Sequence, residues 1–265
     1  MTIQRVNVLG VGISAVNMQQ TVETITGWIQ SRAHHYVAVT SVHGVMECWR
    51  NPELRRIFNR SGMTTPDGMP LVWLARLAGH RHVRRVYGPD LMLAVCQHGL
   101  GRGYRHYFHG GQAGVAELLG DRLTARFPGL QVAGTYSPPF RALTPEEDRG
   151  IVEQINRDAP DIVWVGLSTP KQERWMADHL GKISAPVMIG VGAAFDFLSG
   201  RKRQAPRWMQ RSGLEWLFRL VTEPRRLWPR YRQFPRFVVL LAAQAVGLIK
   251  VPLLTKGDAG SDAQE

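Results

Sequence analysis

Several common kinds of site are missing from this chain. Its 265 residues include only two cysteines, Cys48 and Cys96, and neither stands in a Cys-x-x-Cys pair or at a metal-ligand spacing from histidine. Isolated cysteines in apolar surroundings are typical of buried free thiols in a reducing compartment. The sequence also lacks an Asp-x-Asp pair, a Gly-x-x-x-x-Gly-Lys-Ser/Thr loop and a Gly-x-Ser-x-Gly elbow. We therefore expect no metal and no resident cofactor.

Long hydrophobic runs are also missing. No segment reaches the ~20 apolar residues that span a bilayer, and residues 237–249, between Arg236 and Lys250, come nearest. Their length suits a helix that lies in or dips into a membrane surface, or alternatively a C-terminal core helix. The N-terminus has no long apolar stretch of the signal-peptide kind, so we expect the body of the protein to stay in the cytoplasm. Hydrophobic and charged contents of 44% and 20% predict a folded globular protein.

Acidic residues are scarce near the C-terminus. Residues 201–250 hold twelve lysines and arginines, opposed only by Glu215 and Glu223, so they carry ten of the chain's twelve net positive charges. Aromatic residues lie among these cations: Trp208, Trp216, Trp228 and Tyr231. This concentration predicts an anionic partner. An anionic substrate, a nucleic acid and a membrane surface bound by a non-catalytic scaffold all remain open at this point.

Short apolar runs alternate with amphipathic stretches along the first 200 residues. Strands are predicted at 5–9, 36–39, 104–109, 131–135, 162–167 and 187–191. Helices are predicted at 18–31, 51–60, 70–78, 89–101, 112–127, 145–158 and 170–181. This alternation is typical of a Rossmann-like α/β fold, a mostly parallel sheet covered by helices. In such sheets ligands bind at the carboxyl ends of the strands.

Glycine-rich segments follow two of the predicted strands. Gly10-x-Gly12-x-x-Ala15 resembles a dinucleotide fingerprint, but the next strand does not end in the acidic residue that should hold a ribose, which favours a simple turn. The segment Phe108–Gly114 is the better phosphate-loop candidate because it follows a strand and opens a helix. A purely structural turn explains it equally well.

One carboxylate is a candidate general base. Asp67 lies in a tight turn before an apolar helix, where a turn residue or helix cap is the alternative explanation. Thr40 and His43 follow the predicted strand at 36–39 and share the strand-end face with Asp67. Asp67 could accept a proton from an attacking hydroxyl if burial raised its pKa.

Two further polar residues follow later strands. Gln172 starts a helix directly after a strand and could hydrogen-bond a ligand, whereas Lys171 and Glu173 fit a solvated face. Asp196 stands between two phenylalanines after a glycine-rich strand end, so it needs a partner, either a backbone cap or a donor from a ligand.

Six ordered blocks of the chain resemble bacterial glycosyltransferases of the WecG/TagA/CpsF family, from about Val6 to Tyr231. The blocks are Pro66–Met69, Arg85–Asp90, Phe108–Gly111, Gly166–Glu173, Gly192–Phe197 and Ala205–Pro224. The resemblance implies metal-independent, inverting transfer of a sugar from a UDP-sugar to a polyprenyl-diphosphate-linked saccharide. The donor sugar expected is of the N-acetylmannosamine, uronic acid or glucose type.

The resemblance also implies roles for particular residues. Asp67 is the expected general base, and Thr40 assists near the acceptor hydroxyl. Donor or nucleotide binding is expected of Arg85, Gly110, Gly111, Gly134, Gln172 and Asp196. Diphosphate binding is expected of Arg219, Arg226 and Arg230. Many members carry Asn where this chain has Val42, so His43 is a candidate substitute in sugar recognition, and Pro229 stands where arginine is frequent.

The expected organisation follows from these assignments. Residues 1–200 form an α/β catalytic core, 201–255 a basic helical appendage that closes over the diphosphate and docks on an anionic membrane, and 256–265 a disordered tail. The expected location is peripheral, on the cytoplasmic face of the bacterial inner membrane. No nucleic acid is expected as a partner of the enzyme, and self-association into a homo-oligomer is left open.

Overall fold

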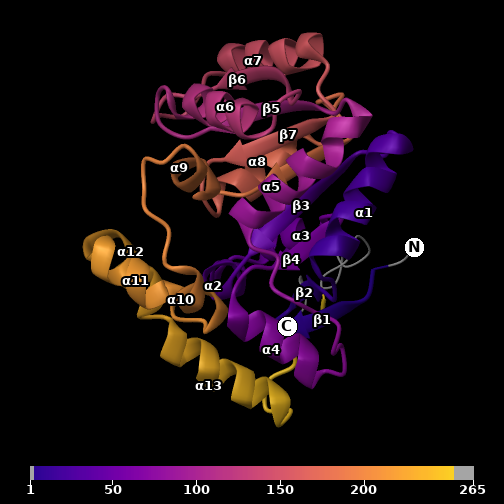
Figure 1. Ribbon diagram of the computed structural model, residues 1–265. Helices are drawn as coiled ribbons and strands as arrows, with labels where there is room; N and C mark the ends of the chain where they lie inside the picture. Colours follow the sequence, from indigo (N-terminus) through magenta and orange to yellow (C-terminus); the bar gives the residue numbers. More distant parts are fainter. Residues whose placement is uncertain (1–2, 254–265) are drawn as a thin grey trace. The chain divides into compact units, whose positions relative to one another are not determined.

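The computed structural model describes residues 3–253 (Figure 1). The chain folds into two compact units, each assembled from segments that are distant in sequence. We call residues 17–39 and 86–203 the sheet unit, and residues 1–16, 40–85 and 204–265 the basic unit. By sequence the basic unit holds nineteen lysines and arginines against eight acidic residues, so eleven of the twelve net positive charges belong to it.

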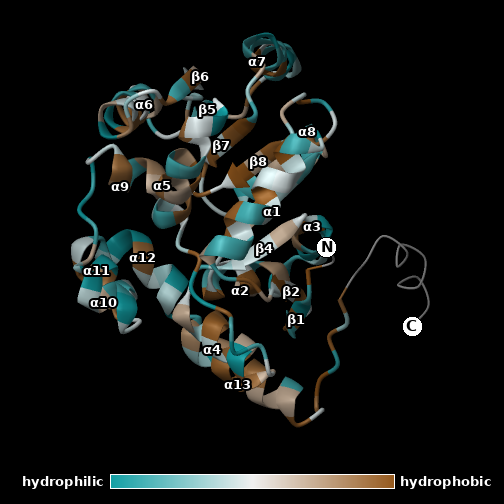
Figure 2. Ribbon diagram, turned by 45° about the vertical axis from the view of Figure 1, so that its right-hand side comes forward, coloured by the Kyte–Doolittle hydropathy of each residue, from teal (hydrophilic) through white to brown (hydrophobic). Residues whose placement is uncertain are grey.

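The sheet unit is built on parallel strands in the order β3-β8-β7-β5-β6. These strands are β3 (His35–Thr40), β5 (Arg105–Gly110), β6 (Gln131–Tyr136), β7 (Ile162–Gly166) and β8 (Val187–Gly190). Every residue of β8 and all but the last of β7 are buried, and Figure 2 shows both strands largely in the hydrophobic colours. Continuous apolar runs of this kind are typical of parallel strands that helices cover on both faces.

Helices cover this sheet on its two faces. They are α1 (Met18–Gln30), α5 (Gly88–Gly99), α6 (Val115–Arg126), α7 (Pro145–Asp158), α8 (Lys171–His179) and α9 (Ala194–Leu198). Helices α1, α5, α9 and α6 pack successively against one another. Because the chain steps outward from β5 to β6 through α6 and then back through α7, right-handed crossovers place α7 and α8 on the opposite face. The predicted Rossmann-like class is therefore confirmed.

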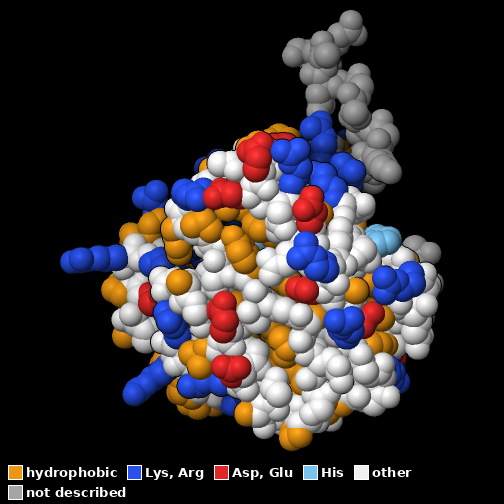
Figure 3. All heavy atoms as spheres, turned by 90° about the horizontal axis from the view of Figure 1, so that it is seen from above, with side chains coloured by type: hydrophobic (Ala, Val, Ile, Leu, Met, Phe, Trp, Pro, Cys, Tyr) orange, Lys and Arg blue, Asp and Glu red, His pale blue; other side chains and the backbone are white. Residues whose placement is uncertain are grey.

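The outer helix α7 has a strongly polar surface. Thr144 and Glu147 form a capping box at its start, and Arg141 binds Glu147 at 2.6 Å. Glu146 and Arg149 pair at 3.0 Å on the next turn. Figure 3, which looks down from the top of Figure 1, shows acidic and basic side chains interspersed over this face. This arrangement fits a near-neutral, solvated surface.

The basic unit begins with an antiparallel hairpin. Strands β1 (Arg5–Val8) and β2 (Val11–Ser14) are joined by Leu9 and Gly10, whose φ angles of 51° and 82° belong to a two-residue type I′ turn. The turn interpretation of the Gly10-x-Gly12 segment is thus confirmed. Strand β4 (Met63–Pro66) packs against β2. The helices of this part are α2 (Val42–Arg50), α3 (Pro52–Arg60) and α4 (Met69–Leu77).

The C-terminal part of the basic unit is helical, as predicted. Its helices are α10 (Arg207–Arg211), α11 (Glu215–Thr222), α12 (Pro224–Tyr231) and α13 (Phe234–Ala245). Gly213, with φ +78°, and Pro224 separate the first three. Helix α13 buries Phe237 and packs against α2, and Gln244 accepts a hydrogen bond from the Leu9 amide at 3.0 Å. No helix within residues 3–253 is long and apolar enough to span a bilayer.

The domain boundary near residue 200 stays a prediction. The tail at 256–265 lies outside the described residues.

Candidate active site

The backbone fixes Asp67 between two strand ends. Asp67 follows β4, and its amide N–H donates to the Thr40 carbonyl oxygen at 2.7 Å. The N-cap of α4 is Gly68, which makes no side-chain cap bond. The Asp67 carboxylate is therefore not used as the helix cap that was the structural alternative, and it is available for other contacts.

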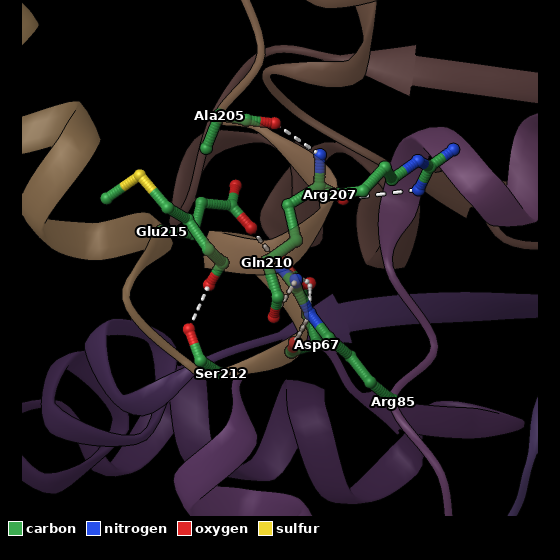
Figure 4. Close-up of polar contacts among 8 residues, drawn as sticks. Asp67, Arg85, Ala205, Arg207, Gln210, Ser212 and Glu215 are labelled. Atoms are coloured by element: carbon green, nitrogen blue, oxygen red, sulfur yellow. Dashed lines mark hydrogen bonds and ion pairs between the residues drawn. The ribbon is translucent and has the colours of Figure 1, made fainter.

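Arg85 joins two carboxylates of the basic unit (Figure 4). Its Nη2 lies 3.0 Å from Asp67 Oδ1 and 2.6 Å from Glu215 Oε2, while its Nε also bonds the Asp67 carbonyl oxygen. Its Nη1 donates to the Gln210 carbonyl oxygen at 3.4 Å. Arg85 was expected in a donor pocket. The structure places it on the candidate base and connects that base to α11.

The pKa of Asp67 is raised from 3.8 to about 6. Burial of the carboxyl group is the largest cause of this rise. The guanidinium of Arg85 lowers the pKa, and the charge of Glu215 raises it. The side chain nevertheless keeps 26% of its surface exposed, so a substrate hydroxyl can reach it. A carboxylate with a pKa near 6 is mostly ionised at neutral pH and is basic enough to take a proton from such a hydroxyl.

Arginines of α11 and α12 act electrostatically on one another and on Asp67. Burial lowers the pKa of Arg230, and the charges of Arg226 and Arg219 lower it further, as expected for guanidinium groups held near one another. Arg219 also acts on Asp67, whose pKa it lowers. Arg226 is held by Glu223 at 2.6 Å. The structure thus brings the three predicted diphosphate ligands into one unit with Asp67.

Two residues of this neighbourhood had no predicted role. One is Glu215, only 8% exposed, which lies in the block Ala205–Pro224 but had no expected function. The other is Tyr231, whose ring packs edge-on against Trp216 at 5.9 Å. Burial raises the pKa of the Tyr231 hydroxyl, and the charges of Arg219 and Asp67 also act on it. An acid in a basic aromatic segment was the signal that could have identified Glu215.

Thr40 and His43 belong to the basic unit as well. The Thr40 hydroxyl is almost fully buried beside Gly44, where a Cβ would collide with it. His43 is the second residue of α2, and its Nδ1 lies 3.8 Å from Glu47 Oε1. Burial is the main reason that the pKa of His43 falls to about 4, and Arg230 and Arg50 lower it further. His43 is therefore a neutral imidazole at physiological pH.

The predicted nucleotide-binding glycines lie in the sheet unit. A Cβ on Gly110 would stand 2.7 Å from the Gly166 backbone, and one on Gly134 would stand 2.6 Å from the Tyr107 ring. Gly111 has φ +77°, which favours glycine. Close packing thus accounts for these glycines, and their role in phosphate binding stays a prediction.

Gln172 and Asp196 also belong to the sheet unit. Asp196 Oδ2 lies 3.0 Å from Lys202 Nζ, so its partner is a side chain of the same unit. Gln172 is only 2% exposed. The expectation of a solvated Glu173 is wrong, because this residue is fully buried and accepts hydrogen bonds from Thr169 and Gln172. Lys171 is exposed, as predicted.

The described part of the chain contains no group of three or more His, Cys, Asp or Glu residues that could hold a metal ion. Cys48 and Cys96 are both buried, as predicted, and burial raises the pKa of the Cys96 thiol to about 12.

Comparison with known proteins identifies the family. The model of the Glycosyl transferase WecG/TagA/CpsF family matches residues 6–250. Three proteins named N-acetylglucosaminyldiphosphoundecaprenol N-acetyl-beta-D-mannosaminyltransferase are similar to the chain. That of Bacillus spizizenii strain W23 is 30% identical over 192 residues, which cover 72% of each chain. That of Bacillus subtilis strain 168 is 30% identical over 69% of each chain, and that of Staphylococcus aureus strain NCTC 8325 is 24% identical over 90% of this chain and 92% of its own. The chain therefore belongs to the WecG/TagA/CpsF family of glycosyltransferases.

Proposed function

We propose that this glycosyltransferase moves a sugar from a UDP-sugar to a polyprenyl-diphosphate-linked saccharide. The names of its relatives specify N-acetylglucosaminyl-diphosphoundecaprenol as acceptor and an N-acetyl-β-D-mannosaminyl group as the sugar transferred. N-acetylmannosamine is accordingly the first donor sugar to test, followed by its uronic acid and by glucose-type sugars. The observation that carries the proposal is the Asp67 carboxylate, held near neutral pKa beside Arg85 and close to a cluster of arginines.

Asp67 is the proposed general base. Both contacts of Arg85 with the carboxylate fall on Oδ1, so we assign Oδ2 to the acceptor hydroxyl. The hydroxyl oxygen forms a bond to the anomeric carbon while its proton passes to Asp67. The bond from the anomeric carbon to the phosphate oxygen breaks, and UDP leaves with the electron pair. The β configuration in the relatives' names supports attack opposite the phosphate of an α-configured donor, which inverts the anomeric centre.

The negative charge of the leaving UDP is assigned to the arginines of α11 and α12. Burial is the main cause of the lowered pKa of Arg230, and repulsion from Arg226 and Arg219 lowers it further. A diphosphate relieves this repulsion and forms charge-assisted hydrogen bonds with guanidinium groups. Catalysis without a metal is part of the proposal, and equal activity in EDTA and in Mg²⁺ is the result that supports it.

Peripheral attachment to an anionic membrane is proposed for the C-terminal helices. Large apolar side chains stay exposed along them, including Trp208, Trp216, Val221, Trp228 and Val239. Exposed apolar side chains combined with many arginines are typical of segments that bind at a lipid surface. The cytoplasmic face of the membrane is the proposed location, because the acceptor is lipid-linked and the donor is a nucleotide sugar.

The deciding experiment measures UDP release from a panel of UDP-sugars with a short-chain lipid-diphosphate-linked N-acetylglucosamine acceptor. Release that requires both substrates supports the proposal. Absence of release with every donor at high enzyme concentration would contradict it. A floated-vesicle assay with anionic and neutral lipid compositions tests the membrane part separately, and binding that is equal for both compositions would argue against the charge contribution.

A further inference from the structure

The side-chain amide of Gln172 is held in one orientation. Gln172 Nε2 donates to Glu173 Oε1 at 2.9 Å, and Thr169 Oγ1 donates to the same oxygen at 2.9 Å. The backbone is fixed too, since the Gln172 amide N–H bonds the Ser168 carbonyl oxygen at 3.0 Å. Turning the amide over would place its carbonyl oxygen against a carboxyl oxygen that is already an acceptor.

Glu173 is well placed to impose this orientation. It is fully buried, and burial raises the pKa of its carboxyl group against the opposing effect of the bonds from Gln172 and Thr169. Because both donors converge on Oε1, that oxygen accepts hydrogen bonds whether or not Oε2 carries a proton. A buried carboxyl group of this kind is costly unless it has a structural or functional use.

The fixed amide leaves an acceptor at the end of β8. Gln172 Oε1 has no hydrogen-bond partner among residues 3–253 and is buried. A Cβ added to Gly192 would meet Oε1 at 3.4 Å and nothing else closer than 4.0 Å, so the absent side chain leaves space beside this oxygen. A buried acceptor without a donor is unfavourable, and ligands of open α/β sheets bind at strand ends.

We propose that Glu173 is a positioning residue that makes Gln172 a hydrogen-bond acceptor for the sugar nucleotide. The matching ligand group is a hydroxyl or an imide N–H, which a ribose and a uracil both carry. The inference rests on the proposed function for the identity of the ligand, and it adds which residue orients the amide and which end of the amide faces the nucleotide.

The test is a double-mutant cycle read by calorimetric binding of UDP, with Glu173→Met, Gln172→Met and the double variant. Methionine matches the length of both side chains and accepts no strong hydrogen bond. We expect each single variant to weaken UDP binding about tenfold and the double variant to be no weaker than either, because the two residues act through one bond. Glu173→Gln, whose amide oxygen still accepts from both donors, should bind UDP like the wild type.

Asp178→Met, an exposed acid-to-methionine change on the same helix, is the matched control. Wild-type affinity in Glu173→Met, or additive losses in the double variant, would overturn the proposal. If Glu173→Met does not fold, Thr169→Val takes its place with an expected loss of about threefold, and unchanged affinity there would overturn it equally. Failure of the wild type to bind UDP would refute the proposed function as well, whereas normal wild-type binding with unaffected variants refutes only the role of Glu173.

Discussion

Arg85 and Glu215, separated by 130 positions in the sequence, are joined by a 2.6 Å contact between Nη2 and Oε2. The same nitrogen lies 3.0 Å from Asp67 Oδ1, so one guanidinium group is divided between two carboxylates. Glu215 therefore affects Asp67 in two ways. The negative charge of Glu215 raises the pKa of Asp67. Its contact with Nη2 also takes up part of the positive charge of Arg85, which lowers that pKa.

Glu215→Gln should shift the pH dependence of turnover. The substitution removes a negative charge beside Asp67 and leaves Arg85 to pair with Asp67 alone, so the pKa of Asp67 falls below about 6. The acid limb of kcat/KM should move to lower pH by about half a unit or more, while the plateau rate falls because the base is weaker. Glu53→Gln, at an exposed acid of α3, is the control. An acid limb that stays in place or moves to higher pH would contradict the role of Glu215.

Asp67→Asn should abolish most of the turnover while UDP binding is largely retained. The amide keeps the shape of the carboxylate but cannot take the proton, and general base catalysis is worth roughly 10²–10⁴-fold. Single-turnover rates and UDP affinity measured on the same preparation separate the two effects. Asp121→Asn on the exposed face of α6 is the matched control. A variant with wild-type kcat would remove Asp67 from the mechanism.

The same substitution should also change the pH dependence of stability. The pKa of Asp67 is higher in the folded protein than its ordinary 3.8, so the folded state favours the protonated form. The stability that protonated Asp67 contributes is fully present below pH 4 and is lost as the pH rises through about 6. The amide side chain of the Asp67→Asn variant does not titrate, so the variant does not lose this stability. The Tm of the variant minus the Tm of the wild type should therefore rise by a few degrees between pH 4 and pH 8. A constant difference in Tm across this range would show that the pKa is not raised.

The strands of the sheet unit were predictable because continuous apolar runs and capping residues in the sequence report local structure. Strands β7 and β8 are continuous apolar runs, and the capping box of α7 is visible in the sequence. Strand β4 was missed because it is buried without being apolar. The hydroxyl of Thr64 bonds the Phe58 carbonyl oxygen at 3.1 Å, and its amide donates to Ser14 Oγ at 3.0 Å. Its polar groups are satisfied by distant residues, which no local pattern records.

The candidate site was likewise predictable from the sequence only in part. Thr40 could be proposed because it follows an apolar run, and Asp67 because it lies in a tight turn before an apolar helix; the structure joins them through a backbone hydrogen bond. The connection of Arg85 to Glu215 depends on the return of the C-terminal helices to the unit that contains Asp67. Burial of Glu173 was unpredictable for a related reason, since an acid at a helix start is usually solvated and its bond to Gln172 is a property of the fold.

Gly44→Ala should destabilise the fold and lower activity together. A Cβ at this position collides with Thr40 Oγ1, and overpacking of a buried site costs about 1–3 kcal/mol, more than the helix propensity that alanine adds. Thermal unfolding and kcat both report the change. The double variant Thr40→Ala with Gly44→Ala removes the collision, so stability should return while activity stays low. Recovery of full activity in the double variant would show that the Thr40 hydroxyl has no part in the reaction.

Arg230→Ala should weaken binding of UDP much more than Arg232→Ala does. Both substitutions remove one positive charge from the same stretch of chain, but Arg230 is half-buried beside Arg219 and Arg226, whereas Arg232 is exposed. A guanidinium group that binds a diphosphate directly contributes about 1.5–3 kcal/mol, so the inhibition constant for UDP should rise tenfold or more in Arg230→Ala.

Arg232→Ala should leave the inhibition constant for UDP within about twofold at physiological salt, since exposed charges are screened. Because the charge of Arg230 lowers the pKa of His43, that pKa should rise above about 4 in the Arg230→Ala variant and can be followed by the NMR signals of the imidazole. Equal losses in the two arginine variants would mean that UDP responds only to the overall charge of the C-terminal helices, and the assignment of Arg230 to the diphosphate would have to be abandoned.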